Sequence, residues 1–139
     1  MAGGPSRGEG KGGGDNSELK TQNLKPKIGI PYIFFFHDYL PFWATLLWEL
    51  GFDIEVSPKT NRQIINLGLE RLLSEACFPV KVAHGHIGYL LDKNIDAIFL
   101  PSFINLNTPE DSLERGFACP HTQTITYFSK VAFDGIKTI

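Results

Sequence analysis

Short apolar segments alternate with amphipathic helical segments along this chain. This order restricts the chain to few architectures. Residues 27–31, 52–56 and 95–100 are typical of buried or half-buried strands. Helical patterns separate these segments, and no hairpin signal joins any two of them. Strands that alternate with helices form parallel sheets covered by helices on both faces. The sequence therefore predicts an α/β fold with a three-layer parallel sheet, Rossmann-like or flavodoxin-like, with the strand order 2-1-3.

Capping signals mark where the helices begin. Asp38 is a candidate N-cap for the helix that follows the first strand. Thr60 and Gln63 have the spacing of a capping box. A second helix is therefore predicted from Thr60 to about Ser74.

Both cysteines of the chain precede a proline that can begin a helix. Cys77 lies two residues ahead of Pro79, and Cys119 lies directly ahead of Pro120. Proline suits the first helical position because its missing N–H needs no partner there. Apolar residues recur at helical spacing from Pro79 towards Asn94, which predicts a third helix. A helix N-terminus favours a thiolate, the form that binds metals and attacks electrophiles.

Other roles for these cysteines are weighed against that one. A free cysteine is often buried simply as a small apolar side chain. A disulfide is disfavoured because the sequence has no signal peptide and is not a short cysteine-dense scaffold. A structural zinc site is disfavoured because His84 and His86 lack the spacing of a zinc ligand pair.

The first 26 residues differ in composition from the rest. They are rich in glycine and nearly lack large apolar residues, which predicts a disordered Gly-rich tail or linker over residues 1–26 and an α/β domain over residues 27–139. Residues 1–27 hold five Lys/Arg and three Asp/Glu (+2), which leaves 8 and 12 in the remainder (−4). A net charge of −4 over residues 28–139 argues against a nucleic-acid partner, because nucleic-acid binding requires a basic face. Because the sequence has neither a membrane-length apolar run nor a secretory segment, we expect a cytoplasmic protein without a membrane partner.

The C-terminal part combines a long loop with weaker signals. Residues 102–121 are predicted to form a loop that brings Cys119 to the carboxyl end of the sheet. For residues 122–133 a helix capped near Thr122 is favoured over a strand. Residues 135–139 resemble the opening of a further strand, which indicates a fragment of a longer protein, incomplete at its C-terminus.

A series of short blocks along the chain is similar to one known family. In order, the blocks are Lys27-Ile-Gly-Ile-Pro, Tyr39-Leu-Pro-Phe-Trp, Glu49-Leu-Gly-Phe, Ser57-Pro-Lys-Thr-Asn, Glu75-Ala-Cys-Phe-Pro-Val-Lys, Ala83-His-Gly-His, Ile98-Phe-Leu-Pro and Cys119-Pro-His-Thr-Gln. Together they resemble the acyl-CoA dehydratase activase-related proteins, which are relatives of the 2-hydroxyacyl-CoA dehydratase subunits. The similarity covers roughly residues 27–128 of this chain.

The resemblance implies a 4Fe-4S or related iron–sulfur cluster that an ATP-dependent activase reduces at low potential. In the dehydratases the electron then enters a 2-hydroxyacyl-CoA, a chemistry of anaerobic metabolism. Cys77 and Cys119 match two of three cluster cysteines, and the third is not in this chain, which holds only two. The resemblance thus predicts a cluster-binding domain of a lyase or reductase system, inactive alone, with an activase and an acyl-CoA as partners.

Further site candidates lie beside these motifs. Lys81, His84 and His86 follow on the predicted third helix and could lie next to the cluster, where a histidine could tune its potential or supply a proton. His84 is the only candidate for a catalytic role. A solvated lysine and a buried histidine tied to a backbone carbonyl are the competing interpretations. His37 and Tyr39, after the first strand, are candidate substrate contacts.

Two other functions compete with the cluster-binding hypothesis. The chain could be a cofactor-free structural or docking module of a larger multidomain protein. It could also be an α/β domain that binds a small molecule and carries incidental cysteines.

Overall fold

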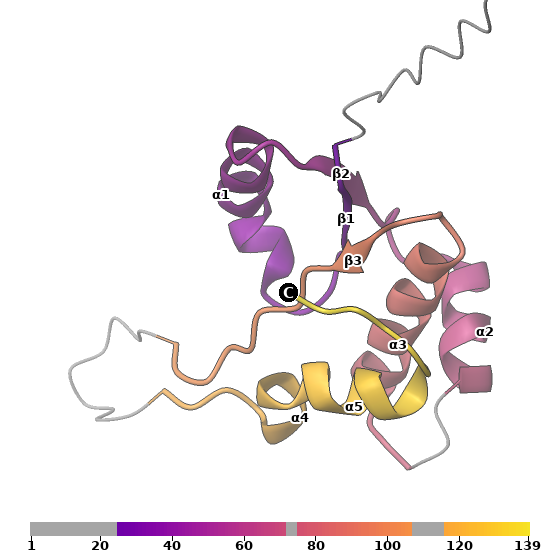
Figure 1. The fold of residues 1–139 in the computed structure, drawn as a ribbon. Coiled ribbons are helices and arrows are strands. Elements are labelled where there is room, and N and C mark those ends of the chain that lie inside the picture. Colours follow the sequence, from indigo (N-terminus) through magenta and orange to yellow (C-terminus); the bar gives the residue numbers. More distant parts are fainter. Residues whose placement is uncertain (1–24, 72–74, 107–115) are drawn as a thin grey trace, which may run out of the picture.

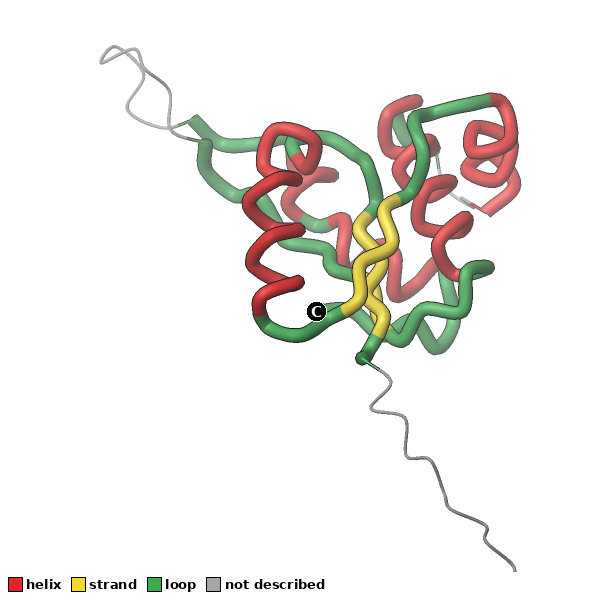
Figure 2. Tube along the Cα trace, turned by 90° about the horizontal axis from the view of Figure 1, so that it is seen from above, coloured by secondary structure: helices red, strands yellow, loops and turns green. Residues whose placement is uncertain are grey.

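A parallel three-stranded sheet organises the computed structural model, which describes residues 25–71, 75–106 and 116–139. The elements are β1 (Lys27–Ile30), α1 (Phe36–Glu49), β2 (Asp53–Val56), α2 (Arg62–Arg71), α3 (Phe78–Leu91), β3 (Ala97–Ile98), α4 (Pro120–Gln123) and α5 (Ile125–Ala132). The strand order is β2-β1-β3, with both pairs parallel. Figure 1 shows α1 on one side of the sheet and α2 and α3 on the other, and Figure 2 shows the strands between these helices from above. The predicted α/β fold and strand order are confirmed.

The central strand is buried because helices cover both of its faces. Ile28 and Ile30 of β1 belong to the hydrophobic core, together with Ile98 of β3. β1 pairs with β2 from Lys27↔Asp53 onwards and with β3 through Ile28↔Ala97. The third strand is shorter than the predicted segment 95–100, although the backbone N–H of Phe99 still donates to Gly29 at 2.9 Å.

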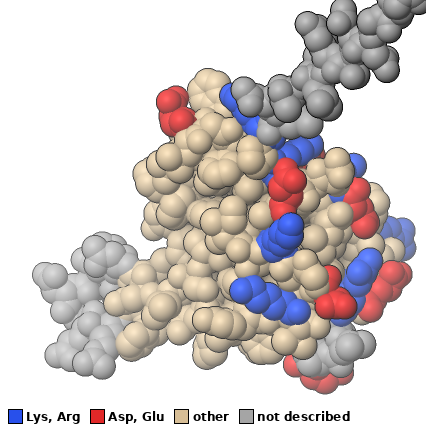
Figure 3. All heavy atoms as spheres, in the orientation of Figure 1, with Lys and Arg blue, Asp and Glu red and all other residues tan. Residues whose placement is uncertain are grey.

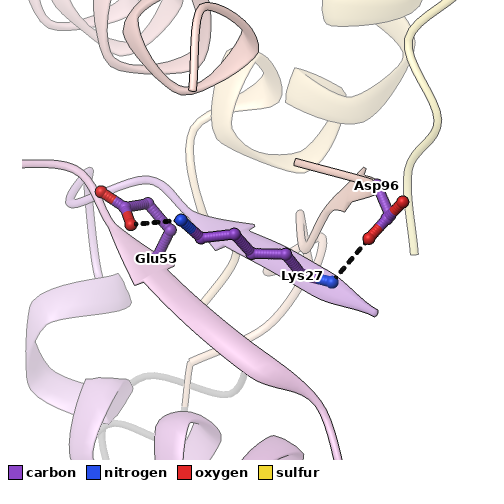
Figure 4. A network of polar contacts seen from close by, with 3 residues as sticks. All are labelled: Lys27, Glu55 and Asp96. Carbon is purple, nitrogen blue, oxygen red and sulfur yellow. Dashed lines mark hydrogen bonds and ion pairs between the residues drawn. The ribbon is translucent and has the colours of Figure 1, made fainter. Parts of the chain in front are cut away.

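Lys27, the first residue of β1, contacts both segments that flank this strand. The Lys27 ammonium lies 2.9 Å from the Glu55 carboxylate of β2, and the Lys27 backbone N–H donates to Asp96 Oδ2 at 2.7 Å (Figure 4). The hydrogen bond to Glu55 raises the pKa of the Lys27 ammonium above its usual value. Lys27 thus connects β1 to both flanking segments, at the end of the sheet opposite to that where parallel sheets bind ligands.

The predicted N-cap of the first helix is wrong. α1 begins at Phe36, and its N-cap residue Phe35 makes no side-chain cap hydrogen bond. The helix begins earlier because the preceding turn closes through the backbone, with the N–H of Phe36 donating to the carbonyl of Ile33 at 2.9 Å. Asp38 instead lies in the first helical turn, where a carboxylate interacts favourably with the helix dipole.

The capping box predicted for the second helix is also wrong. Asn61, and not Thr60, caps α2, because Asn61 Oδ1 accepts the backbone N–H of Ile64 at 3.1 Å. The Thr60 hydroxyl is engaged elsewhere, 3.0 Å from Nε2 of His86. The predicted helix end at Ser74 lies outside the described residues.

Replacement of Asn61 by alanine is expected to lower the free energy of unfolding by about 1 kcal/mol, because it removes the side-chain acceptor at the start of α2. Urea unfolding followed by circular dichroism measures this change. Gln63→Ala is the control, since the capping-box role of that exposed residue is not realised. An equal loss in both variants would contradict the assignment of Asn61 as the cap.

The two helices on one side of the sheet approach each other through glycine. A Cβ atom placed on Gly68 of α2 would overlap the backbone carbonyl of Lys81, and one on Gly85 of α3 would overlap that of Ile64. Each glycine therefore faces the backbone of the other helix with no side chain between them. This contact fixes α3 tightly against α2 and buries residues on both flanks of α3.

The structure confirms the helix and part of the strand that were predicted for the C-terminal part of the chain. α5 occupies residues 125–132, so the helix favoured for residues 122–133 is present, although its N-cap residue is Thr124 rather than Thr122. Thr138 forms an isolated parallel bridge with Ile98, as expected for an opening strand. The predicted loop 102–121 folds back through an antiparallel bridge between Asn105 and Phe117, and its residues 107–115 are not described.

Within the described residues, no helix has the length and apolar character required to cross a membrane.

Candidate functional site

Both cysteines occupy the same structural position, directly before a helix that carries a proline in its first turn. Cys77 is the N-cap residue of α3 and Cys119 is the N-cap residue of α4. The Cys77 carbonyl accepts the N–H of Val80 at 3.0 Å, and the Cys119 carbonyl accepts that of Thr122 at 2.9 Å. The predicted placement of Cys77 at a helix start is therefore confirmed, whereas Cys119, predicted within the loop 102–121, precedes a helix because α4 already begins at Pro120. One detail differs, because α3 begins at Phe78 and not at Pro79.

The two thiols are accessible and unbonded. Both side chains are exposed, and both cysteines are free. Figure 1 shows the start of α3 and the short helix α4 beyond the carboxyl ends of the strands. This is the end at which parallel α/β sheets bind their ligands. Among the described residues, no group of three or more His, Cys, Asp or Glu side chains is arranged to hold a metal ion.

His84 is a fully buried histidine with one unsatisfied nitrogen. Its Nδ1 lies 2.8 Å from the carbonyl oxygen of Val80, which can only accept, so Nδ1 carries the proton. Its Nε2 finds no hydrogen-bond partner among the described residues. The ring stacks on Phe133, with centroids 6.1 Å apart. Burial lowers the pKa of His84, which is therefore neutral at pH 7.

His86 is buried in a polar cluster that sequence reasoning missed. Its Nδ1 lies 2.8 Å from Ser57 Oγ, and its Nε2 lies 3.0 Å from Thr60 Oγ1. Ser57 Oγ also accepts the backbone N–H of Tyr32 at 2.8 Å. Burial lowers the pKa of His86 to about 4, so this ring is neutral at pH 7 as well. A sequence signal existed, since Ser57 directly follows a strand at the end where functional polar residues gather.

The hydrogen-bond pattern selects one tautomer of His86. If Ser57 donates to Nδ1, the Ser57 hydroxyl both donates and accepts, and the N–H at Nε2 of His86 donates to Thr60. In the other tautomer the buried Ser57 hydroxyl proton has no acceptor among the described contacts, which costs about 1–3 kcal/mol. The first tautomer therefore applies. It leaves the hydroxyl proton of the exposed Thr60 free to donate outward.

The remaining sequence candidates lie in different surroundings. Lys81 is half-buried, with its ammonium 4.0 Å from the exposed Glu75 carboxylate, an ion pair that contributes little to stability. His37 is exposed, with its ring centroid 5.4 Å from that of Tyr32. Tyr39 is exposed and stacks on Phe103 at 5.6 Å. Neither His84 nor His86 hydrogen-bonds to a cysteine in the part of the chain that the structure describes.

Aromatic rings pack beyond the carboxyl ends of β1 and β3, the point at which the strand order reverses. Phe103 contacts Phe35, Phe36 and Tyr39 with ring centroids 5.6–5.8 Å apart. Phe34, in the turn after β1, adopts a left-handed conformation with φ 46, which is strained for a residue other than glycine. Aromatic side chains therefore pack at the position where many doubly wound folds bind ligands.

Comparison with known proteins gives one match. A family model described as "CoA enzyme activase uncharacterised domain" matches residues 27–139. No curated protein and no solved structure matches the chain.

Proposed function

The chain belongs to the family described as the CoA enzyme activase uncharacterised domain, and we propose that it binds an iron–sulfur cluster in a 2-hydroxyacyl-CoA dehydratase system. The observation that carries this proposal is the matched placement of Cys77 and Cys119. Each is exposed, free and located at the start of a helix. Thiolates of accessible cysteines are the usual ligands of such clusters.

The residues present fit part of a cluster site. A 4Fe-4S cluster is commonly held by four thiolates, and this chain contains two cysteines. Cys77 and Cys119 would therefore hold the cluster from one side, and the remaining ligands would come from outside the described residues. When bound, the cluster would supply low-potential electron transfer, for which the proposed partners are an ATP-dependent activase and an acyl-CoA substrate.

The surrounding residues would orient and support the two thiols. The backbone N–H groups at the start of α3 favour negative charge beside Cys77. The His84 ring donates a hydrogen bond to the carbonyl of Val80, in the first turn of α3. The His86 ring forms hydrogen bonds with Ser57 and Thr60, which lie in the segment between β2 and α2. We therefore assign His86 the role of fixing α3, and thereby Cys77, relative to the segment that follows β2, whereas the hydrogen bond of His84 lies within α3.

Anaerobic reconstitution of the full chain with iron and sulfide, in the presence of the activase, tests the proposal. The wild type is expected to bind iron and sulfide and to absorb broadly in the visible range, and Cys77→Ser and Cys119→Ser are each expected to lose most of the bound iron. Serine keeps the size of the side chain and is a good N-cap residue, so both variants should fold. Far-ultraviolet circular dichroism checks that they do, and equal iron content in all three proteins would contradict the proposal.

A cofactor-free docking module is the second candidate function. The observation that favours it is the exposure of large apolar side chains on the helices, among them Phe42, Trp48 and Val131. The same reconstitution distinguishes the two functions. A wild type that binds no iron but associates stably with the activase would support the docking module.

A further inference from the structure

Helix α1 exposes a narrow apolar stripe that nothing in the described part of the chain covers. The stripe, here called the α1 patch, consists of Tyr39, Phe42, Leu46 and the C-cap residue Leu50, which are 45%, 59%, 38% and 64% exposed. Their spacing of three, four and four residues places them within about 80° of one another on a helix with 3.6 residues per turn. This spacing resembles that of helices that pack against another helix.

The α1 patch continues onto the segment after β3. Tyr39 stacks on Phe103, and Phe42 contacts Trp43, which in turn contacts Phe99 at 5.0 Å. Figure 3 shows the surface over α1 and this segment with few charged groups, whereas Lys, Arg, Asp and Glu gather over the other side of the view. Four roughly half-exposed large side chains present on the order of 400 Å² of apolar surface, about the size of the apolar centre of a specific interface.

The charges on α1 indicate what kind of partner fits. Its only charged residues are Asp38 and Glu49, eleven positions apart and therefore about 16 Å apart along the axis. At 100° per residue both lie on the same flank of the α1 patch. Neither forms an ion pair within the described residues. Glu49 also lies at the helix C-terminus, where the dipole favours a cation and where α1 has no basic residue.

These charges disfavour a second copy of this chain as the partner. Two α1 helices packed antiparallel would place Asp38 of one copy near Glu49 of the other, and a parallel arrangement would place like residues together. Like charges across an interface oppose association. A partner with cations at the same spacing would instead neutralise both carboxylates.

We propose that the α1 patch is the docking site for an amphipathic helix of another protein or domain, with an apolar stripe flanked by two Lys or Arg residues about three turns apart. Such a helix lays its apolar residues along the stripe and brings one cation to each carboxylate. Helix-in-groove recognition of this kind is a common mode of peptide binding. The inference does not depend on cluster binding, because it uses neither cysteine.

Two designed peptides test the proposal against the full chain. Both are helical and carry leucine at the stripe positions, and they differ only in having two lysines or two glutamates, eleven residues apart, on the flank. We expect the lysine peptide to bind at least tenfold more tightly by fluorescence anisotropy at low salt. Asp38→Lys combined with Glu49→Lys should reverse this preference.

Substitutions in the stripe complete the test. Phe42→Gln with Leu46→Gln should weaken lysine-peptide binding at least tenfold, whereas Val131→Gln, at an apolar residue of α5 that is 88% exposed, should leave it unchanged. Circular dichroism checks that each variant is folded. Equal binding of both peptides, or equal loss in the Val131 control, would overturn the proposal. Self-association of the wild type that Leu46→Gln abolishes would also overturn it, because the patch would then bind a second copy.

Discussion

Gly85→Ala is expected to destabilise the domain by about 2–4 kcal/mol, well above the usual effect of adding one methyl group, because the new Cβ would overlap backbone rather than a movable side chain. The obstacle is the carbonyl of Ile64 in α2, and the backbone N–H of Gly68 lies 3.0 Å from the same Cβ position. No rotamer change can relieve this overlap. The two helices would have to move apart, which would loosen the packing of the fully buried Ile64.

Gly88→Ala provides the matched control on the same helix. A Cβ at Gly88 would meet only the Phe133 ring, at 3.5 Å, which is an ordinary van der Waals distance. Alanine is favoured over glycine in a helix by about 1 kcal/mol, so this variant should be as stable as the wild type or slightly more stable. Urea unfolding of both variants measures the difference. Similar stability of the Gly85 and Gly88 variants would show that α2 and α3 are not in close backbone contact.

The second large effect is a loss of stability in mild acid that depends on His86. Burial lowers its pKa from 6.5 to about 4 in the folded protein, so the unfolded chain binds more protons between these values. The free energy of unfolding is therefore highest above pH 6.5 and falls as the pH is lowered towards 4. At pH 5 the expected loss from this residue is about 2 kcal/mol. The lowered pKa of His84 acts in the same direction.

His86→Gln separates this effect from the titration of carboxylates. Glutamine can still hydrogen-bond but does not titrate, so the fall in the free energy of unfolding between pH 7.5 and pH 5 should be smaller than in the wild type by about 2 kcal/mol. The variant is also expected to be less stable at pH 7.5, because glutamine cannot reproduce both contacts of the imidazole. His37→Gln, at an exposed position, is the control for replacing a histidine by glutamine. An unchanged fall in the His86 variant would refute the prediction.

The sequence predicted those features that depend on neighbouring residues. The strand segments are short and apolar, and helices separate them, which favours parallel pairing. Right-handed connections between parallel strands then predict the order β2-β1-β3. The position of Cys77 was also predictable, because Pro79 two residues later marks a helix start, whereas Cys119 was predicted in a loop. The family resemblance rests on the same local blocks and is supported by the match over residues 27–139.

The tertiary structure decided the features that depend on residues distant in sequence. Thr60 has the spacing of a capping residue, yet its hydroxyl bonds to His86, 26 positions away, and Asn61 takes over the cap. On an isolated helix His86 would lie on the flank of the apolar stripe, but α2 covers that flank because Gly68 and Gly85 let the two backbones meet. Helical periodicity describes one helix at a time, and it contains no information on how closely a second helix will approach. The burial of both histidines, and with it their neutral state, therefore follows from tertiary packing around α3, in which Phe133 stacks on His84 and Ser57 and Thr60 hydrogen-bond to His86.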